Sequence, residues 1–245
     1  MTNIEEYLKQ FHVKLFADGA NLDAMKRLNE LPYIKGCTTN PTLMAKAGIT
    51  DYERFAREVI EAIPDKPISF EVFSDEWPDM ERQAMKLAGF GENVYVKVPI
   101  TNTRREPCHW LVRQLVNAGV KVNVTAILEH EQVIELLPHL VGCGSAFVSV
   151  FAGRIADTGR DATLIMEDCV GSLSTWPELA GVELIWASPR QVWDIFEADA
   201  AGVHVITVMP DILGKLHLLG KDLDEFSLET VQMFRRDAVE AGYTL

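Results

Sequence analysis

The sequence predicts an α/β fold, a single (β/α)8 barrel with a short N-terminal helix and an extra C-terminal helix. Short apolar stretches typical of buried parallel strands alternate eight times with helical patterns along the 245 residues. No linker rich in Gly, Pro or Ser interrupts this alternation, and whole barrels commonly have this length. We therefore expect one domain of the TIM-barrel type, with the N-terminal helix over residues 1–12, the barrel over 13–220 and a C-terminal helical extension over 221–245. An open doubly wound sheet is the main alternative.

The expected strands are short runs in which Val, Ile and Phe predominate, as is typical of strands covered by helices on both sides of a sheet. Pro99 ends the fourth strand, because proline cannot donate to a central ladder. In chain order the eight strands are expected at Val13 to Asp18, Ile34 to Thr39, Ile68 to Phe73, Val94 to Pro99, Val120 to Ala126, Ala146 to Phe151, Leu184 to Ala187 and Val203 to Val208.

Helical periodicity fills the intervals, and capping residues mark several helix starts. Thr2 and Glu5 have capping-box spacing, Asn40 precedes Pro41, and a final amphipathic helix is expected to be capped near Ser227. The barrel helices are expected through Met25 and Leu31, from Pro41, from Tyr52 to Ile63, up to about Ala88, from about Pro107 to Ala118, around Glu129 to Leu140, from Ala162 to about Trp176, from Pro189 to Ala200 and from Asp211 to Leu219.

Charge and missing motifs exclude several functional classes. The formal net charge of −13 at pH 7 argues against nucleic acid or an anionic membrane as partner, but not against a small anion held by a few arginines. The chain has no GxGxxG after a strand, no P-loop and no HxxxH or HxH spacing, so we expect neither a nucleotide cofactor nor a metal site. No apolar run approaches the length of a membrane span. Cysteines without CxxC spacing and an N-terminus unlike a secretory signal favour a cytoplasmic protein.

The fourth strand, Val94 to Pro99, carries a lysine in an otherwise apolar run. Its valines point one way, while Tyr95 and Lys97 point the other way. A lysine buried there must find a partner or lose its proton, and a desolvated amine is the usual nucleophile toward carbonyl groups. On this strand alone, a lysine that is merely salt-bridged in a barrel, or whose stem reaches out of the strand end, is slightly the more common explanation.

The same period-two pattern places further polar side chains on the lumen face of other strands. The residues that we expect to converge near the carboxyl ends of six strands are Asp18, Asn40, Glu71, Lys97, Asn123, Thr125 and Ser149. Singly, each has an ordinary structural explanation: Asn40 as a helix cap, Thr125 as a strand former, and either carboxylate as a salt-bridge partner for Lys97. Together they place more polar groups in one lumen than a purely structural core tolerates, which favours an active site.

These residues lie in motifs that resemble the transaldolases, particularly the short subfamily that also contains the fructose-6-phosphate aldolases. The matching motifs occur in family order and cover about residues 13–220. They are Phe16-Ala17-Asp18-Gly19-Ala20-Asn21, Cys37-Thr38-Thr39-Asn40-Pro41-Thr42, Val96-Lys97-Val98-Pro99, Asn123-Val124-Thr125-Ala126 and Ala187-Ser188-Pro189-Arg190-Gln191. The second and third of these motifs are specific to the family, and the others support them.

The resemblance implies class I chemistry without a metal or an organic cofactor. Lys97 matches the lysine that forms an imine with a ketose carbonyl, and Asp18 the carboxylate that takes the C4 hydroxyl proton. Glu71 and Thr125 match the pair that holds the catalytic water. The resemblance places the substrate-binding positions at Thr38, Asn40, Asn123, Ser149, Phe151, Arg154, Ser188 and Arg190, of which Arg154, Ser188 and Arg190 match the phosphate site. Arg190 is expected to open a helix whose N-terminus adds further donors.

The resemblance implies transfer of a dihydroxyacetone unit from a ketose phosphate to an aldose phosphate by a homo-oligomer. The alternatives are a net aldolase of the fructose-6-phosphate aldolase kind and, from another class, a non-catalytic barrel that binds sugar phosphates. Glu71 and Phe151 favour transfer, because the aldolases of the subfamily carry glutamine and tyrosine there. The stretch from Thr101 to Trp110 departs from the family. Its Arg104 and Arg105 are expected to be solvated, or else to help select an anionic acceptor.

Overall fold

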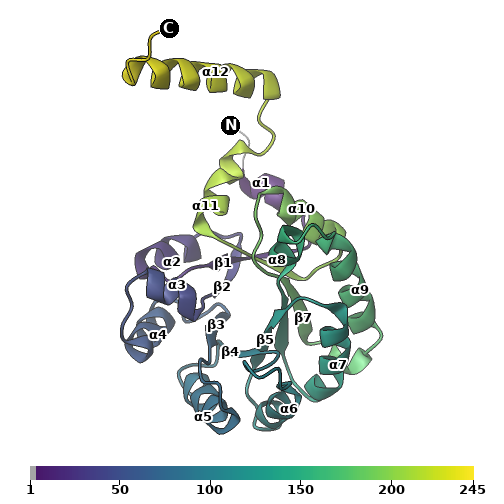
Figure 1. Ribbon diagram of the computed structural model, residues 1–245. Helices are drawn as coiled ribbons and strands as arrows, with labels where there is room; N and C mark the ends of the chain where they lie inside the picture. The colour runs from purple at the N-terminus through teal and green to yellow at the C-terminus, as the bar shows by residue number, and fades with distance from the viewer. Residues whose placement is uncertain (1–3) are drawn as a thin grey trace.

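A computed structural model describes residues 4–245, and in these residues eight parallel strands close into a barrel in sequence order (Figure 1). The strands are β1 Lys14–Asp18, β2 Ile34–Thr38, β3 Ile68–Glu71, β4 Val94–Pro99, β5 Val122–Ile127, β6 Ala146–Val150, β7 Val182–Trp186 and β8 Val205–Val208. The closed ladder, in which β8 pairs with β1, confirms the predicted (β/α)8 TIM barrel over the open sheet.

All the helices except α12 lie around the barrel (Figure 1). The helices of the described residues are α1 Ile4–Leu8, α2 Leu22–Asn29, α3 Pro41–Lys46, α4 Tyr52–Ala62, α5 Trp77–Ala88, α6 His109–Asn117, α7 His130–Leu140, α8 Ala152–Asp157, α9 Ala162–Ser174, α10 Trp193–Ala200, α11 Pro210–Leu213 and α12 Leu223–Glu240, with 3-10 turns at Pro177–Leu179 and Gly214–Leu218. The predicted cap at Thr2 lies outside the described residues, and the N-terminal helix ends at Leu8 rather than near residue 12.

Two apolar layers confirm the predicted alternation of side chains along the strands. The layer between strands and helices is aliphatic and includes the fully buried Val96, Val124 and Val148. The lumen holds a separate and partly aromatic cluster of Phe16, Tyr95, Phe147, Ile185, Ala187 and Val205. Burying a side chain of this size contributes roughly 1.5–3 kcal/mol, so each strand is held on both faces. The polar residues of the lumen therefore stand on a rigid base.

Several elements differ from the prediction, some of them by only one or two residues at a strand end, as in β3, β5 and β8. A short helix, α8, follows Phe151 directly, where only a loop was expected. The helix after β7 begins at Trp193 and not at Pro189, because Ser188 adopts the left-handed region at φ 64° and delays the helix. Strand β7 begins at Val182, two residues before the predicted start. The last helix begins at Leu223, since Asp222 and not Ser227 caps it.

Helix α12 extends away from the barrel (Figure 1). None of its residues is buried, and it carries apolar side chains such as Leu228, Val231 and Phe234, each more than half exposed. An apolar surface of this kind is unusual on an isolated monomer. Among the described residues, no helix combines the length and the apolar character that crossing a membrane requires.

Candidate active site

Lys97 lies in the middle of the barrel and has very little contact with solvent. Its residue is 6% exposed, and its Nζ donates to the Thr39 carbonyl oxygen at 3.3 Å. Glu71 Oε2 lies 3.4 Å from the same nitrogen. The register explains this arrangement, because Glu71 on β3, Lys97 on β4 and Asn123 on β5 are direct neighbours across the ladder. The amine and the carboxylate therefore share one level of the lumen.

Asp18 ends β1 and joins the same group of side chains. The Thr38 hydroxyl donates to Asp18 Oδ1 at 2.8 Å, and Thr207 on β8 hydrogen-bonds Thr38 in turn. Burial of the carboxyl group in the barrel mouth raises the pKa of Asp18, although the Lys97 charge and the Thr38 hydrogen bond oppose the rise. The Glu71 charge adds to it. Asp18 is thus a carboxylate with more basic character than one in water.

A second hydrogen-bonded chain crosses the lumen beside Lys97. Asn123 Nδ2 donates to Ser69 Oγ at 2.9 Å, and Ser149 Oγ donates to Asn123 Oδ1 at 2.7 Å. All three side chains are buried. This chain fixes the orientation of the Asn123 amide and leaves it one further donor position for a ligand.

The buried Thr125 hydroxyl has no hydrogen-bond partner among the described residues. A buried hydroxyl without a partner is costly, so such groups commonly mark a place for a ligand or a water molecule. Backbone geometry next to Thr125 is also unusual, because Ala126 adopts φ 63° and the pairing of β5 with β6 shifts its register there. β-Bulges of this kind often occur next to active sites, where they re-aim a side chain.

Asn40 and Phe151 lie where the sequence places them, at the ends of β2 and β6. Asn40 Oδ1 accepts from the Leu43 amide at 3.0 Å, so the capping role is real and only the amide nitrogen is left for a ligand. Phe151 packs against the lumen cluster and precedes α8. Its ring offers no hydroxyl to the site.

The three predicted phosphate residues lie on the two segments that follow β6 and β7: Arg154 is on α8, and Ser188 and Arg190 are on the loop after β7. Gly153 and Ser188 bring these segments together, because a Cβ on Gly153 would lie 1.6 Å from the Ser188 carbonyl oxygen. Arg190 Nη1 donates to Ser188 Oγ at 3.2 Å, and its guanidinium also forms a two-point ion pair with Asp157. The Arg154 guanidinium lies over the Phe151 ring, 4.9 Å from its centroid. Arg190 is not the first residue of a helix, as predicted, but precedes α10 by three positions.

The loop that departs from the family is bound to the preceding loop. Arg104 and Arg105 are both exposed, as the simpler interpretation expects. Arg104 is nevertheless engaged, since it forms ion pairs with Asp75, Glu76 and Glu106. This network joins the loop after β4 to the loop after β3, so Arg104 has a structural explanation.

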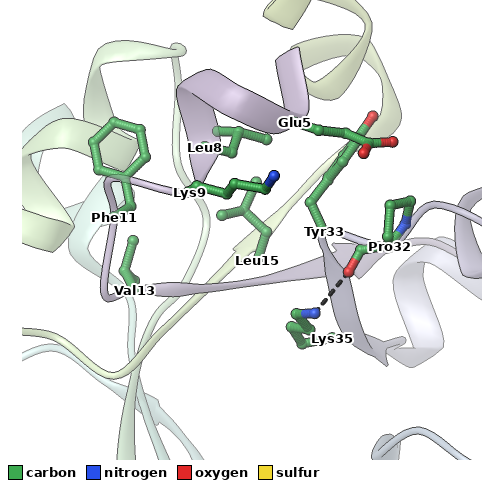
Figure 2. Close-up of a pocket in the computed structure, with 9 residues that line it drawn as sticks. All are labelled: Glu5, Leu8, Lys9, Phe11, Val13, Leu15, Pro32, Tyr33 and Lys35. Carbon is green, nitrogen blue, oxygen red and sulfur yellow. Dashed lines mark hydrogen bonds between the residues drawn. The ribbon is translucent and has the colours of Figure 1, made fainter. Parts of the chain in front are cut away.

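Pockets occur at both ends of the barrel. A pocket of about 330 Å³ beneath α1 is lined by Leu8, Lys9, Tyr33 and Lys35 among others and opens beside the amino-terminal halves of β1 and β2 (Figure 2). Barrel active sites lie at the opposite, carboxyl end of the strands, so this pocket is not the candidate site. A second pocket of about 330 Å³ adjoins Asp18 at the carboxyl end.

Ser69 and Thr207 are site residues that the sequence analysis did not single out. Ser69 stands two positions before Glu71 and therefore shares its face of β3. Thr207 likewise shares the lumen face of β8 with Val205. The period-two pattern could have found both residues. In the described part of the chain, no three His, Cys, Asp or Glu side chains are placed so that they could hold a metal ion.

The raised pKa of Asp18 predicts a pH-dependent stability difference. Ionised Asp18 costs folding free energy at neutral pH, so Asp18→Asn should raise the free energy of unfolding there. The gain should shrink as pH falls through the raised pKa and vanish below the unfolded pKa of about 3.9. Denaturant titrations between pH 3 and 8 measure it. Asp157→Asn is the control of opposite sign, because Arg190 lowers the pKa of Asp157. A loss of stability in Asp18→Asn at neutral pH would contradict the analysis.

Comparison with known proteins identifies the family of this chain. The family described as Transaldolase/Fructose-6-phosphate aldolase matches residues 15–245. A "Probable transaldolase" of Thermoanaerobacter sp. (strain X514) is 32% identical over 230 residues, which cover 94% of this chain and 99% of that protein. Another "Probable transaldolase", from Nitrosopumilus maritimus (strain SCM1), is 32% identical over 83% of this chain and 87% of its own.

Solved structures of other families share only the fold. An HpcH/Hpal aldolase/citrate lyase family protein from Burkholderia cenocepacia J2315 superposes with a TM-score of 0.57 at 14% identity, covering 96% of this chain and 100% of that one. The family match, by contrast, extends over nearly the whole sequence and includes every predicted site residue. The chain belongs to the transaldolase and fructose-6-phosphate aldolase family.

Proposed function

We propose that the protein is a transaldolase that moves a dihydroxyacetone unit from a ketose phosphate, such as fructose 6-phosphate or sedoheptulose 7-phosphate, to an aldose phosphate. The observation that carries the proposal is the buried Lys97 amine, 6% exposed and 3.4 Å from Glu71 at the carboxyl end of the barrel. A purely binding barrel has no use for a desolvated amine beside a carboxylate. The protein functions in sugar-phosphate metabolism in the cytoplasm.

The first step is attack of the Lys97 amine on the C2 carbonyl of the ketose. The carbonyl oxygen takes up a proton to give a carbinolamine, which loses water and becomes a protonated imine. Glu71 is the group within reach to relay these protons, through a water molecule held with the Thr125 hydroxyl. The unpaired Thr125 Oγ1 supports that role, because a bound water would supply its missing hydrogen bond.

The second step is cleavage of the C3–C4 bond. Asp18 accepts the proton of the C4 hydroxyl, the C3–C4 electron pair moves into the imine, and an aldehyde departs. The elevated pKa of Asp18 supports this assignment, since a more basic carboxylate takes up the proton more readily. An enamine remains on Lys97 and adds to the aldehyde carbon of the acceptor by the reverse sequence.

Binding of the two ends of the donor uses different parts of the site. The chain of Ser69, Asn123 and Ser149 presents amide and hydroxyl groups to the dihydroxyacetone end, and Asn40 adds its amide nitrogen. Arg154 on α8, with Ser188 and Arg190 on the loop after β7, takes the phosphate. Asp157 already neutralises part of the Arg190 charge, so bound phosphate shares this guanidinium with a carboxylate.

Net aldol cleavage is the second candidate, and Glu71 and Phe151 argue for transfer. In the aldolase branch, glutamine and tyrosine at these positions are associated with protonation of the enamine and release of dihydroxyacetone. Phe151 offers no such hydroxyl, so the three-carbon unit stays on Lys97 until an acceptor arrives.

Assembly into homo-oligomers is part of the proposal, and the exposed apolar residues of α12 support it.

Borohydride trapping tests the imine. With fructose 6-phosphate present, reduction should inactivate the enzyme and add a substrate-derived mass to the peptide that contains Lys97. Lys97→Met should lose both the adduct and turnover. Lys14→Met is the matched control, because Lys14 is also an ion-paired lysine of a barrel strand but lies at the amino end of β1. An adduct on another lysine, or binding without any adduct, would contradict the proposal.

Substitution of the arginines tests the phosphate site. Arg154→Ala or Arg190→Ala should raise KM for fructose 6-phosphate by about one to two decades, because a charge-assisted hydrogen bond contributes roughly 1.5–3 kcal/mol. KM for unphosphorylated fructose should change little. Arg54→Ala, an exposed arginine paired on α4, is the control. Equal effects on both donors would place the two arginines outside the phosphate site.

The balance between transfer and release tests the choice of branch. The double variant Glu71→Gln with Phe151→Tyr should lower the rate of transfer to erythrose 4-phosphate and raise the release of free dihydroxyacetone. Coupled assays with and without the aldose acceptor measure the two rates. If the parent enzyme already releases dihydroxyacetone faster than it transfers it, the aldolase alternative takes the place of the transaldolase.

A further inference from the structure

Strand β3 lacks a partner strand on one of its two sides at the position of Glu71. On one side it pairs with β4 along its whole length, from Ile68 to Glu71. On the other side β2 pairs with it only at Ile68 and Ser69, after which the chain turns into α3. In a parallel ladder the N–H and C=O of one residue face the same neighbour, and those of Glu71 face β2. The end of β2 thus leaves two backbone groups of Glu71 to be satisfied by another element.

The Tyr52 hydroxyl satisfies both groups. It accepts from the Glu71 amide at 2.9 Å and donates to the Glu71 carbonyl oxygen at 2.7 Å. One hydroxyl thus replaces the two backbone hydrogen bonds that a longer β2 would make to Glu71. Burial raises the pKa of the Tyr52 phenol, which keeps its proton available for donation. The ring is held against Phe73, with centroids 5.3 Å apart, and stands on the first residue of α4.

The Glu71 carboxylate depends on this backbone support for its position. Within the described residues, the one partner found for its oxygens is Lys97 at 3.4 Å, and no neutral side chain or backbone amide orients it. The Glu71 side chain is also 21% exposed, so packing alone does not fix it. Its location relative to the amine follows from where the backbone of Glu71 is held.

We propose that Tyr52 is a positioning residue, whose hydroxyl completes the barrel at the end of β2 and thereby keeps the Glu71 carboxylate within reach of Lys97. Its kinetic consequence rests on the proposed imine chemistry. Tyr52 does not touch the reacting atoms, because its hydroxyl is engaged with the backbone of Glu71 on both sides. A shift of the carboxylate by about 1 Å can cost on the order of 100-fold in rate.

The experiment compares Tyr52→Phe with Tyr95→Phe. The first removes the two hydrogen bonds to Glu71 and keeps the ring. The second removes a buried tyrosine hydroxyl that hydrogen-bonds Ser145 Oγ at 2.7 Å, elsewhere in the same lumen. Tyr52→Phe should lower kcat for transfer by about tenfold or more, leave KM for fructose 6-phosphate within about twofold, and speed hydrogen exchange of the Glu71 amide. Tyr95→Phe should leave kcat, KM and the hydrogen exchange of the Glu71 amide unchanged.

A double-mutant cycle separates positioning from general loosening of the structure. In a Glu71→Ala background, Tyr52→Phe should lower kcat little further, because the hydroxyl acts through the carboxylate. Fully multiplicative losses, or equal kcat in Tyr52→Phe and Tyr95→Phe, would overturn the inference while leaving the imine intact. Failure to trap any adduct on Lys97 in the parent enzyme would refute the proposed function instead. The exchange rate of the Glu71 amide would still decide whether Tyr52 holds that backbone.

Discussion

An amino group removed from water between two carboxylates is the interaction on which the rest of the site depends. An isolated ammonium at the depth of Lys97 would be very costly, and the negative charges of Glu71 and Asp18 offset that cost. One amine cannot fully compensate both Asp18 and the partly exposed Glu71. The imbalance appears at Asp18, where burial raises the pKa despite the nearby lysine. The arrangement that is hardest to stabilise is thus the one that contains both the proposed nucleophile and the proposed base.

The barrel can hold these charged groups because the aliphatic layer that packs against the helices lies on the opposite face of the strands from the polar site. Aliphatic residues such as Val96 and Val124 bind the strands to the helices, so the polar lumen contributes little to holding the fold together. Register then sets the chemistry, because Glu71, Lys97 and Asn123 are neighbours across three successive strands. The groups proposed to act on the reacting carbon stand on strands, whereas those proposed for the phosphate stand on α8 and on the loop after β7. The strands therefore hold the groups proposed for bond formation and cleavage more rigidly than loops would.

Sequence periodicity could predict the barrel and the side chains that face its lumen, because both follow from alternation along single strands. Lys97, Glu71 and Asp18 were found in this way. The pairing of Arg190 with Asp157 could not be predicted, since it depends on two segments that Gly153 allows to approach closely. Elements held by loop geometry, such as α8 and the start of α10, were missed for the same reason. The hydrogen bonds of Tyr52 to the Glu71 backbone were missed too, because no pattern within one element shows where a neighbouring strand ends.

The central claim is that Lys97 bonds covalently to the ketose carbonyl, and oxygen exchange tests it most directly. Imine formation expels the C2 oxygen as water, and hydrolysis of the imine brings in an oxygen from solvent. Fructose 6-phosphate labelled with ¹⁸O at C2 should therefore lose its label in the presence of the enzyme at least as fast as it is turned over. In Lys97→Met the loss should fall to the rate of the uncatalysed exchange. Turnover of the ketose with full retention of the label in the recovered substrate and in the ketose formed by transfer would contradict the account.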